Sequence, residues 1–104
     1  MILYNVTVSI DPSVHQEWLN WMKTKHVPDV MATGCFVEAR ISRVKGEEEG
    51  GLTFAISYVC ESQEIYDRYQ SEHAAVLQKE HGEKYAGQFA AFRTMLTILE
   101  EFKA

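Results

Sequence analysis

The sequence has only two cysteines, Cys35 and Cys60, which are too few for a disulfide framework. Both lie at the ends of predicted strands, where they could be neighbours across a hairpin. In a reducing cytosol we expect two small, half-buried free thiols instead. A small secreted scaffold held together by several disulfides is therefore excluded.

Long apolar runs and targeting signals are missing as well. No stretch reaches the length of a transmembrane helix. The opening residues "MILYNVTVSI" lack the basic start and the cleavage site of a signal peptide. We therefore expect a cytoplasmic protein with no membrane partner.

Positive charge is scarce. Lys and Arg number 10 against 15 Asp and Glu, which gives a net charge of −5. No basic run interleaved with aromatic residues occurs. This composition argues against a polyanion partner, so we expect no binding of nucleic acid.

Motifs that hold cofactors are also absent from the sequence. It contains no phosphate loop, no dinucleotide glycine fingerprint and no serine elbow. The four histidines do not fall at metal-ligand spacings, so a metal site would need tertiary structure to assemble it. We expect neither a metal nor a cofactor.

What is present fits one domain over residues 1–104. Residues 2–10 alternate between apolar and polar side chains, which predicts a strand with one apolar face. Asp11 and Pro12 begin a helix whose apolar stripe carries two tryptophans. This helix should end near Lys25, because the residue before Pro28 is pushed away from helical angles, and residues 28–33 can then form one short second turn closed by Gly34.

The second half predicts two strands, a helix and a last strand. Residues 35–45 and 52–60 form a hairpin around a charged, glycine-rich turn at 46–51. Ser62 caps a long helix over residues 63–82, with a break near Ser71 as an option and Gly82 or Gly87 as its end. Residues 89–102 form the last strand. The order β-α-β-β-α-β predicts an α+β, ferredoxin-like fold: a four-stranded antiparallel sheet with both helices on one face.

The sheet face opposite the helices carries the predicted ligand-binding residues. Alternation places Asn5, Arg40 and Arg93 there, together with an apolar set formed by Leu3, Phe36, Met95 and Leu99. In one interpretation this face is solvated, and the arginines form weak ion pairs with residues such as Glu38. In the other, two subunits pack face to face as a homodimer, and the three polar residues line a pocket for an anionic ligand.

Two histidines are the candidate catalytic residues. His26 could act as a general base, since histidine titrates near neutral pH, or could only cap the end of the first helix. His73 lies on the apolar stripe of the second helix, where it could serve catalysis or be a satisfied, half-buried side chain.

The order of elements, "TKHVPDVMATGCF" after the first helix and "EIYDRYQSEHAAVLQKEH" after the third strand resemble the dimeric α+β barrel superfamily. Within it, the chain is most similar to a family of uncharacterised small bacterial proteins. The resemblance implies a homodimer with a ligand site. It does not imply which chemistry that site performs, because this fold serves oxygenases, isomerases, cyclases and binding modules. Haem-degrading members pair an asparagine and a histidine, which Asn5 and His73 resemble, with a sheet tryptophan that is missing here.

Two functions follow from this resemblance. The first is a homodimeric small-molecule-binding or structural module. The alternative is a cofactor-independent enzyme, an oxygenase, isomerase or cyclase, that acts on a small aromatic or anionic substrate through His26 or His73 with an arginine. The sequence leaves open whether the protein is an enzyme.

Overall fold

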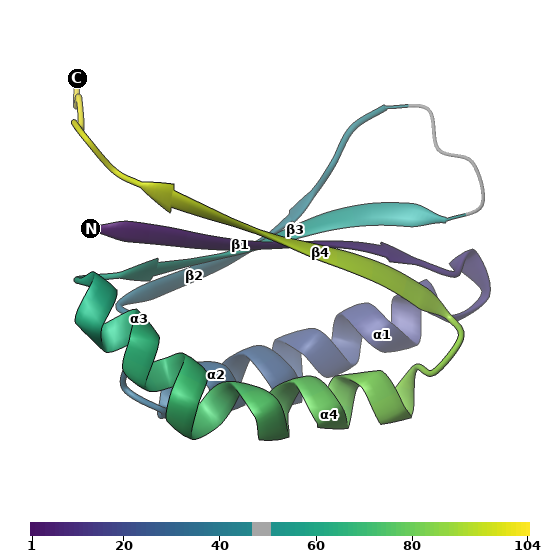
Figure 1. Ribbon diagram of the computed structural model, residues 1–104. Coiled ribbons are helices and arrows are strands. Elements are labelled where there is room, and N and C mark those ends of the chain that lie inside the picture. Colours follow the sequence, from purple (N-terminus) through teal and green to yellow (C-terminus); the bar gives the residue numbers. More distant parts are fainter. Residues whose placement is uncertain (47–50) are drawn as a thin grey trace.

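The structure, a computed structural model, describes residues 1–46 and 51–104. Its helices cover one face of a single antiparallel sheet with the strand order β2-β3-β1-β4 (Figure 1). The four strands are β1 (Ile2–Ile10), β2 (Glu38–Arg43), β3 (Leu52–Cys60) and β4 (Phe89–Thr97). This arrangement confirms the predicted ferredoxin-like fold. Residues 47–50 of the predicted turn lie outside the described residues.

The helical layer of the first half does not end at Lys25, so that prediction is wrong. Three segments follow one another after a short 3-10 turn: α1 (His15–Trp21), the π-helical segment η2 (Met22–His26) and α2 (Val27–Ala32). The Val27 amide donates to the Met22 carbonyl, five residues earlier, as in a π turn. Pro28 then stands in the first turn of α2, where its missing N–H leaves little unsatisfied. The helix therefore passes the proline without stopping.

The second long helix also contains a π turn, at the predicted break near Ser71. Its segments are α3 (Gln63–Tyr69), η3 (Gln70–Ala74) and α4 (Ala75–Lys84). The Ser62 hydroxyl accepts a hydrogen bond from the Ile65 amide at 3.2 Å, which confirms the predicted cap. The helix continues through Gly82, and Gly87 follows its end with a φ of 75°.

The core lies between the sheet and the helices. β1 contributes Ile2, Tyr4, Val8 and Ile10, as its alternation predicts, and all four are buried. Phe36 is buried as well: its ring centroid lies 4.8 Å from that of Tyr69. Its predicted place on the open face is therefore wrong. β2 begins only at Glu38, so Phe36 does not take part in the alternation of that strand.

The faces of β4 are the reverse of the prediction. The strand register sets Arg93 opposite Val6 and Met95 opposite Tyr4, so both side chains share the helix-covered face. Phe92 and Leu96 instead lie on the open face, at 63% and 46% exposure. Apolar residues occupy both parities of this strand, so alternation could not decide between them. The strand ends at Thr97, before the predicted end at residue 102.

Within the described residues, the longest helices are too short and too polar to cross a membrane.

Candidate functional site

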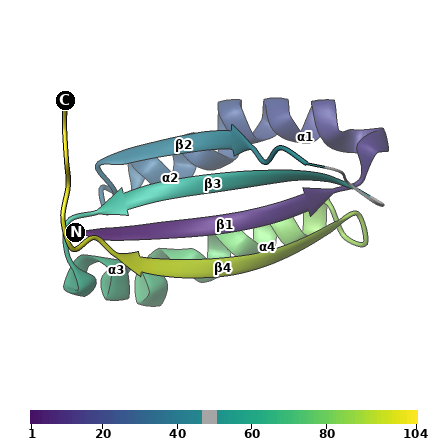
Figure 2. The same ribbon diagram turned by 90° about the horizontal axis from the view of Figure 1, so that it is seen from above.

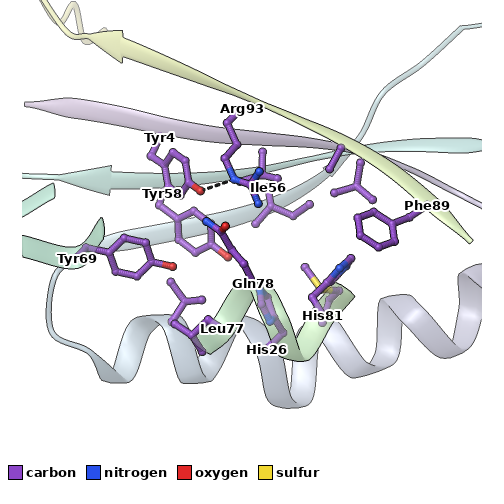
Figure 3. Close-up of a pocket in the computed structure, with 15 residues that line it drawn as sticks. Tyr4, His26, Ile56, Tyr58, Tyr69, Leu77, Gln78, His81, Phe89 and Arg93 are labelled. Atoms are coloured by element: carbon purple, nitrogen blue, oxygen red, sulfur yellow. Dashed lines mark hydrogen bonds between the residues drawn. The ribbon is translucent and has the colours of Figure 1, made fainter. Parts of the chain in front are cut away.

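The candidate site is a cavity of about 70 Å³ between the covered face of the sheet and the helices (Figure 3). Its wall is largely apolar, with Val6, Val8, Met22, Val30, Ile56, Leu77, Phe89 and Ala91. Polar groups enter it from three directions: Arg93 from β4, His26 from the first helical layer, and Gln78 and His81 from α4. An apolar cavity with a few convergent polar groups is typical of a small-molecule site.

Arg93 is the cationic group of this cavity. Its Nε donates to the Tyr4 hydroxyl at 3.0 Å, which directs the guanidinium between the sheet and α4 (Figure 3). No carboxylate forms an ion pair with it among the described residues. The guanidinium therefore keeps donors in a fork geometry that suits a carboxylate or another planar anion.

His26 reaches the cavity because the helix continues past it. Its ring centroid lies 5.2 Å from that of Trp21 and 5.6 Å from that of His81. Burial lowers the pKa of His26, so the ring is neutral at pH 7. Its Nδ1 atom is buried and finds no hydrogen-bond partner in the described part of the chain. Such an atom is a candidate contact for a ligand, since buried polar groups are normally paired.

His81 is a site residue that the sequence reasoning missed. It is 8% exposed, and its Nε2 accepts a hydrogen bond from Trp18 Nε1 at 3.0 Å. Burial, aided by nearby His26 and Arg93, lowers the pKa of His81 to about 4. The π turn Gln70–Ala74 explains the omission. It adds a residue to one turn, and so shifts every later inward position by one relative to a regular helix.

Tyrosine hydroxyls supply neutral donors at the other end of the cavity. Burial raises the pKa of both Tyr58 and Tyr69 well above the usual value, so neither ionises at neutral pH. Gln78 points from α4 toward Tyr58 and Arg93 (Figure 3). The site thus combines one cation with neutral rings, hydroxyls and an amide.

The other predicted ligand-binding residues do not join Arg93. Asn5 and Arg40 lie on the open face of the sheet, because both pair with Ser57 of β3, which alternates with the buried Ile56 and Tyr58. Asn5 Oδ1 accepts from the Ser57 hydroxyl at 3.0 Å. Arg40 Nη2 lies 3.2 Å from Glu38 Oε1, and this exposed ion pair contributes little to stability. The expectation that Asn5, Arg40 and Arg93 share one face of the sheet is therefore wrong, and a ligand-binding role for Asn5 and Arg40 stays a prediction.

Of the two candidate catalytic histidines, only His26 lines the cavity. His73 is half-buried, with its ring 6.3 Å from Tyr69 and its Nε2 3.8 Å from a carboxylate oxygen of Glu72. A catalytic role for either residue stays a prediction. No group of three metal-ligating side chains occurs within residues 1–46 and 51–104.

The fold defines a ferredoxin-like protein, with a cavity between the sheet and its helices. The profile of the family described as "Domain of unknown function (DUF4286)" matches residues 1–99. The chain belongs to this family. No curated protein matches it.

Solved structures with the same fold are similar over almost the whole chain. A dimeric ferredoxin-like protein from an uncultured marine organism is 7% identical, with 97% of each chain covered and a TM-score of 0.76. A second one from such an organism is 15% identical, with 100% of both chains covered and a TM-score of 0.72. SnoaB, a cofactor-independent oxygenase from Streptomyces nogalater, is 7% identical, with 99% of this chain and 97% of that chain covered and a TM-score of 0.68.

Proposed function

We propose that this protein is a homodimeric binding module for a small, largely apolar molecule that carries one anionic group. The observation that carries the proposal is Arg93, a guanidinium without a carboxylate partner among the described residues, in the wall of an apolar cavity. A ligand carboxylate there would form a charge-assisted, bidentate contact. The apolar part of the ligand would lie against Val6, Ile56 and Leu77.

The remaining polar groups support a ligand with one hydrogen-bond donor. His26 Nδ1 is buried and neutral, so it can accept from a hydroxyl or an amide. Neutral histidines add no second positive charge at pH 7. The cavity is small and holds on the order of five water molecules by volume. A monocyclic acid is therefore a better probe than a large polycycle.

The open face of the sheet supports the homodimer. Phe92 and Leu96 expose much of their surface there, and apolar patches of this kind mark interfaces. Two of the similar structures are described as dimeric ferredoxin-like proteins. The proposed location is the cytoplasm, because Cys35 and Cys60 are free thiols, which suits a reducing compartment.

Titration with benzoate, followed by two-dimensional NMR, tests the binding proposal. Benzoate should shift the backbone amide resonances of Arg93, Gln78 and His26. Benzyl alcohol, which lacks the negative charge, should bind more weakly. Arg93→Met should weaken benzoate binding at least about tenfold, as expected for a lost hydrogen bond to a charged group. Arg40→Met is the matched control, because that arginine lies on the other face of the sheet.

Two outcomes would contradict this proposal. One is equal affinity for benzoate and benzyl alcohol, which would leave Arg93 without a role. The other is an equal loss of affinity in both arginine variants, which would point to net charge rather than to a site.

A further inference from the structure

The cavity offers a ligand a second polar contact besides Arg93. His26 lies in η2, and its Nδ1 atom is buried without a hydrogen-bond partner in the described part of the chain. Burial lowers the pKa of this ring, so it is neutral at pH 7 and accepts a hydrogen bond through one nitrogen. Buried polar atoms are normally paired, so this position calls for a donor on the ligand.

The neighbouring histidine does not offer the same acceptor. His81 Nε2 already accepts from Trp18 Nε1 at 3.0 Å, in a buried bond. The hydrogen of the neutral His81 ring therefore lies on Nδ1, which makes that second nitrogen a donor. Of the two histidines that line the cavity in the described part of the chain, His26 is the one with an acceptor left for a ligand.

Arg93 and His26 belong to opposite walls of the cavity. Arg93 points from β4 toward the helices, whereas His26 comes from the helical layer that faces the sheet (Figure 3). The two elements are also offset sideways, because α1 and α2 run along the β2 side of the sheet and α3 and α4 along the β4 side (Figure 2). A ligand whose carboxylate contacts Arg93 therefore reaches His26 with a group at its far end.

The wall between these two contacts favours a flat ring. Four aromatic side chains line the cavity, namely Tyr4, Tyr58, Tyr69 and Phe89. The rings of Tyr4 and Tyr58 are stacked, with centroids 5.8 Å apart. Aromatic side chains pack well against the face or the edge of another ring. The volume of about 70 Å³ suits a single ring better than a fused ring system.

We propose that the ligand is an aromatic acid with a hydroxyl group para to its carboxylate, as in para-hydroxybenzoate. This inference rests on the binding function proposed above and names the class of ligand for the same site. The carboxylate pairs with the Arg93 guanidinium, and the hydroxyl donates to His26 across the cavity. An ortho hydroxyl stays beside its own carboxylate, on the Arg93 side, and does not reach His26.

Affinities for a set of matched acids test this class. Isothermal titration calorimetry at neutral pH should show that para-hydroxybenzoate binds about fivefold more tightly than benzoate, the size of one neutral hydrogen bond. Two other acids should show no such gain. They are ortho-hydroxybenzoate and para-methoxybenzoate, which has the para oxygen without its hydrogen.

Histidine variants assign the gain to one side chain. His26→Phe keeps a ring beside Trp21 but removes the acceptor, so para-hydroxybenzoate and benzoate should then bind equally. His73→Phe, in the second long helix and outside the cavity, is the matched control and should keep the gain.

Nitrogen NMR of the wild-type protein gives a readout that needs no variant. Binding of para-hydroxybenzoate should move a ring-nitrogen resonance of His26, because that nitrogen becomes hydrogen-bonded, and benzoate should leave it in place. His81 should not respond in this way, since its Nε2 stays bonded to Trp18. A shift at His81 instead of His26 would overturn the assigned contact.

The outcomes separate this inference from the binding function on which it rests. Equal affinity of the wild type for benzoate and para-hydroxybenzoate, with Arg93→Met still weakening both, would overturn the hydroxyl contact and leave the anion site intact. A gain that persists in His26→Phe, or that is lost equally in His73→Phe, would also overturn it. A failure of all four acids to bind would overturn both proposals.

Discussion

At the scale of single residues, the buried pair of Trp18 and His81 links the core to the cavity. The indole donates to His81 Nε2, so this nitrogen must stay unprotonated for the bond to persist. A proton on the ring would be buried near Arg93, which also lowers the pKa of His81. The sequence could suggest that the tryptophans lie in the core. It could not show which histidine meets them, because the π turn changes the phase of the helix before His81.

This pair predicts a loss of stability in acid. The pKa of His81 is about 4 in the folded protein, against an ordinary value of 6.5. Above pH 6.5 the residue is neutral in both states and has no effect. As the pH falls from 6.5 toward 4, the unfolded chain binds the proton first, so the free energy of unfolding decreases, by about 3 kcal/mol in full.

Urea unfolding at about pH 7 and about pH 4 checks this expectation against His81→Gln, which keeps an acceptor for Trp18 and does not titrate. The variant should lose about 3 kcal/mol less than the wild type between the two conditions. Equal losses in the two proteins would show that His81 does not contribute to the acid sensitivity.

At the scale of elements, two neighbouring glycines at the end of the second helix should respond in opposite ways to the same change. Gly82 lies inside α4, and a Cβ there would meet nothing within 4 Å. Gly87 also has open space, but its φ is 75°, a backbone conformation that alanine disfavours. Space is therefore equal at the two sites, and only the backbone differs.

Gly82→Ala should raise the free energy of unfolding by about 0.5–1 kcal/mol, because alanine has the higher helix propensity. Gly87→Ala should lower it by about 1–2 kcal/mol through left-handed strain. Chemical denaturation of both variants measures this difference, and a change of the same sign at both sites would refute it.

The elements also show where sequence reasoning reached its limit. The strand cores, the Ser62 cap and the order of elements follow from alternation and capping, and they are confirmed. The continuation of the first helix past Pro28 could not be predicted in this way. The rule that a helix ends before a proline assumes an ordinary α-helical turn at that point, whereas this helix has a π turn there. The same continuation places His26 in the cavity.

At the scale of the whole molecule, the proposed homodimer depends on the open face of the sheet, where Phe92 and Leu96 are exposed. The fold could be predicted because its pattern of elements is specific. The location of the candidate site could not be predicted. It depends on which alternate residues of β4 face the helices, since this decides whether Arg93 lies in the cavity or on the open face. Apolar residues occur in both alternate sets of this strand, so the sequence did not distinguish them.

We expect a dimer at micromolar concentration, with a melting temperature that rises with protein concentration. Phe92→Glu should raise the dissociation constant of the dimer at least about 30-fold, as for an interface hot spot. Its circular dichroism should stay that of a folded protein, since Phe92 is exposed outside the core.

Sedimentation velocity of Phe92→Glu, with Val76→Glu on α4 as the matched control, measures the effect. Val76 is also exposed but lies on α4, on the helix-covered side of the sheet, so its variant should remain dimeric. A monomeric wild type, or equal dissociation of both variants, would contradict a dimer through the sheet.

The two π turns have a consequence for how this site could change during evolution. Each is one residue wider than an ordinary turn, so losing a single codon from Met22–His26 or Gln70–Ala74 would close it. All later side chains of that helix would then turn by about 100° about its axis. A deletion of one codon in Gln70–Ala74, with no substitution in the cavity itself, would exchange His81 for its neighbour and present a different wall to a ligand.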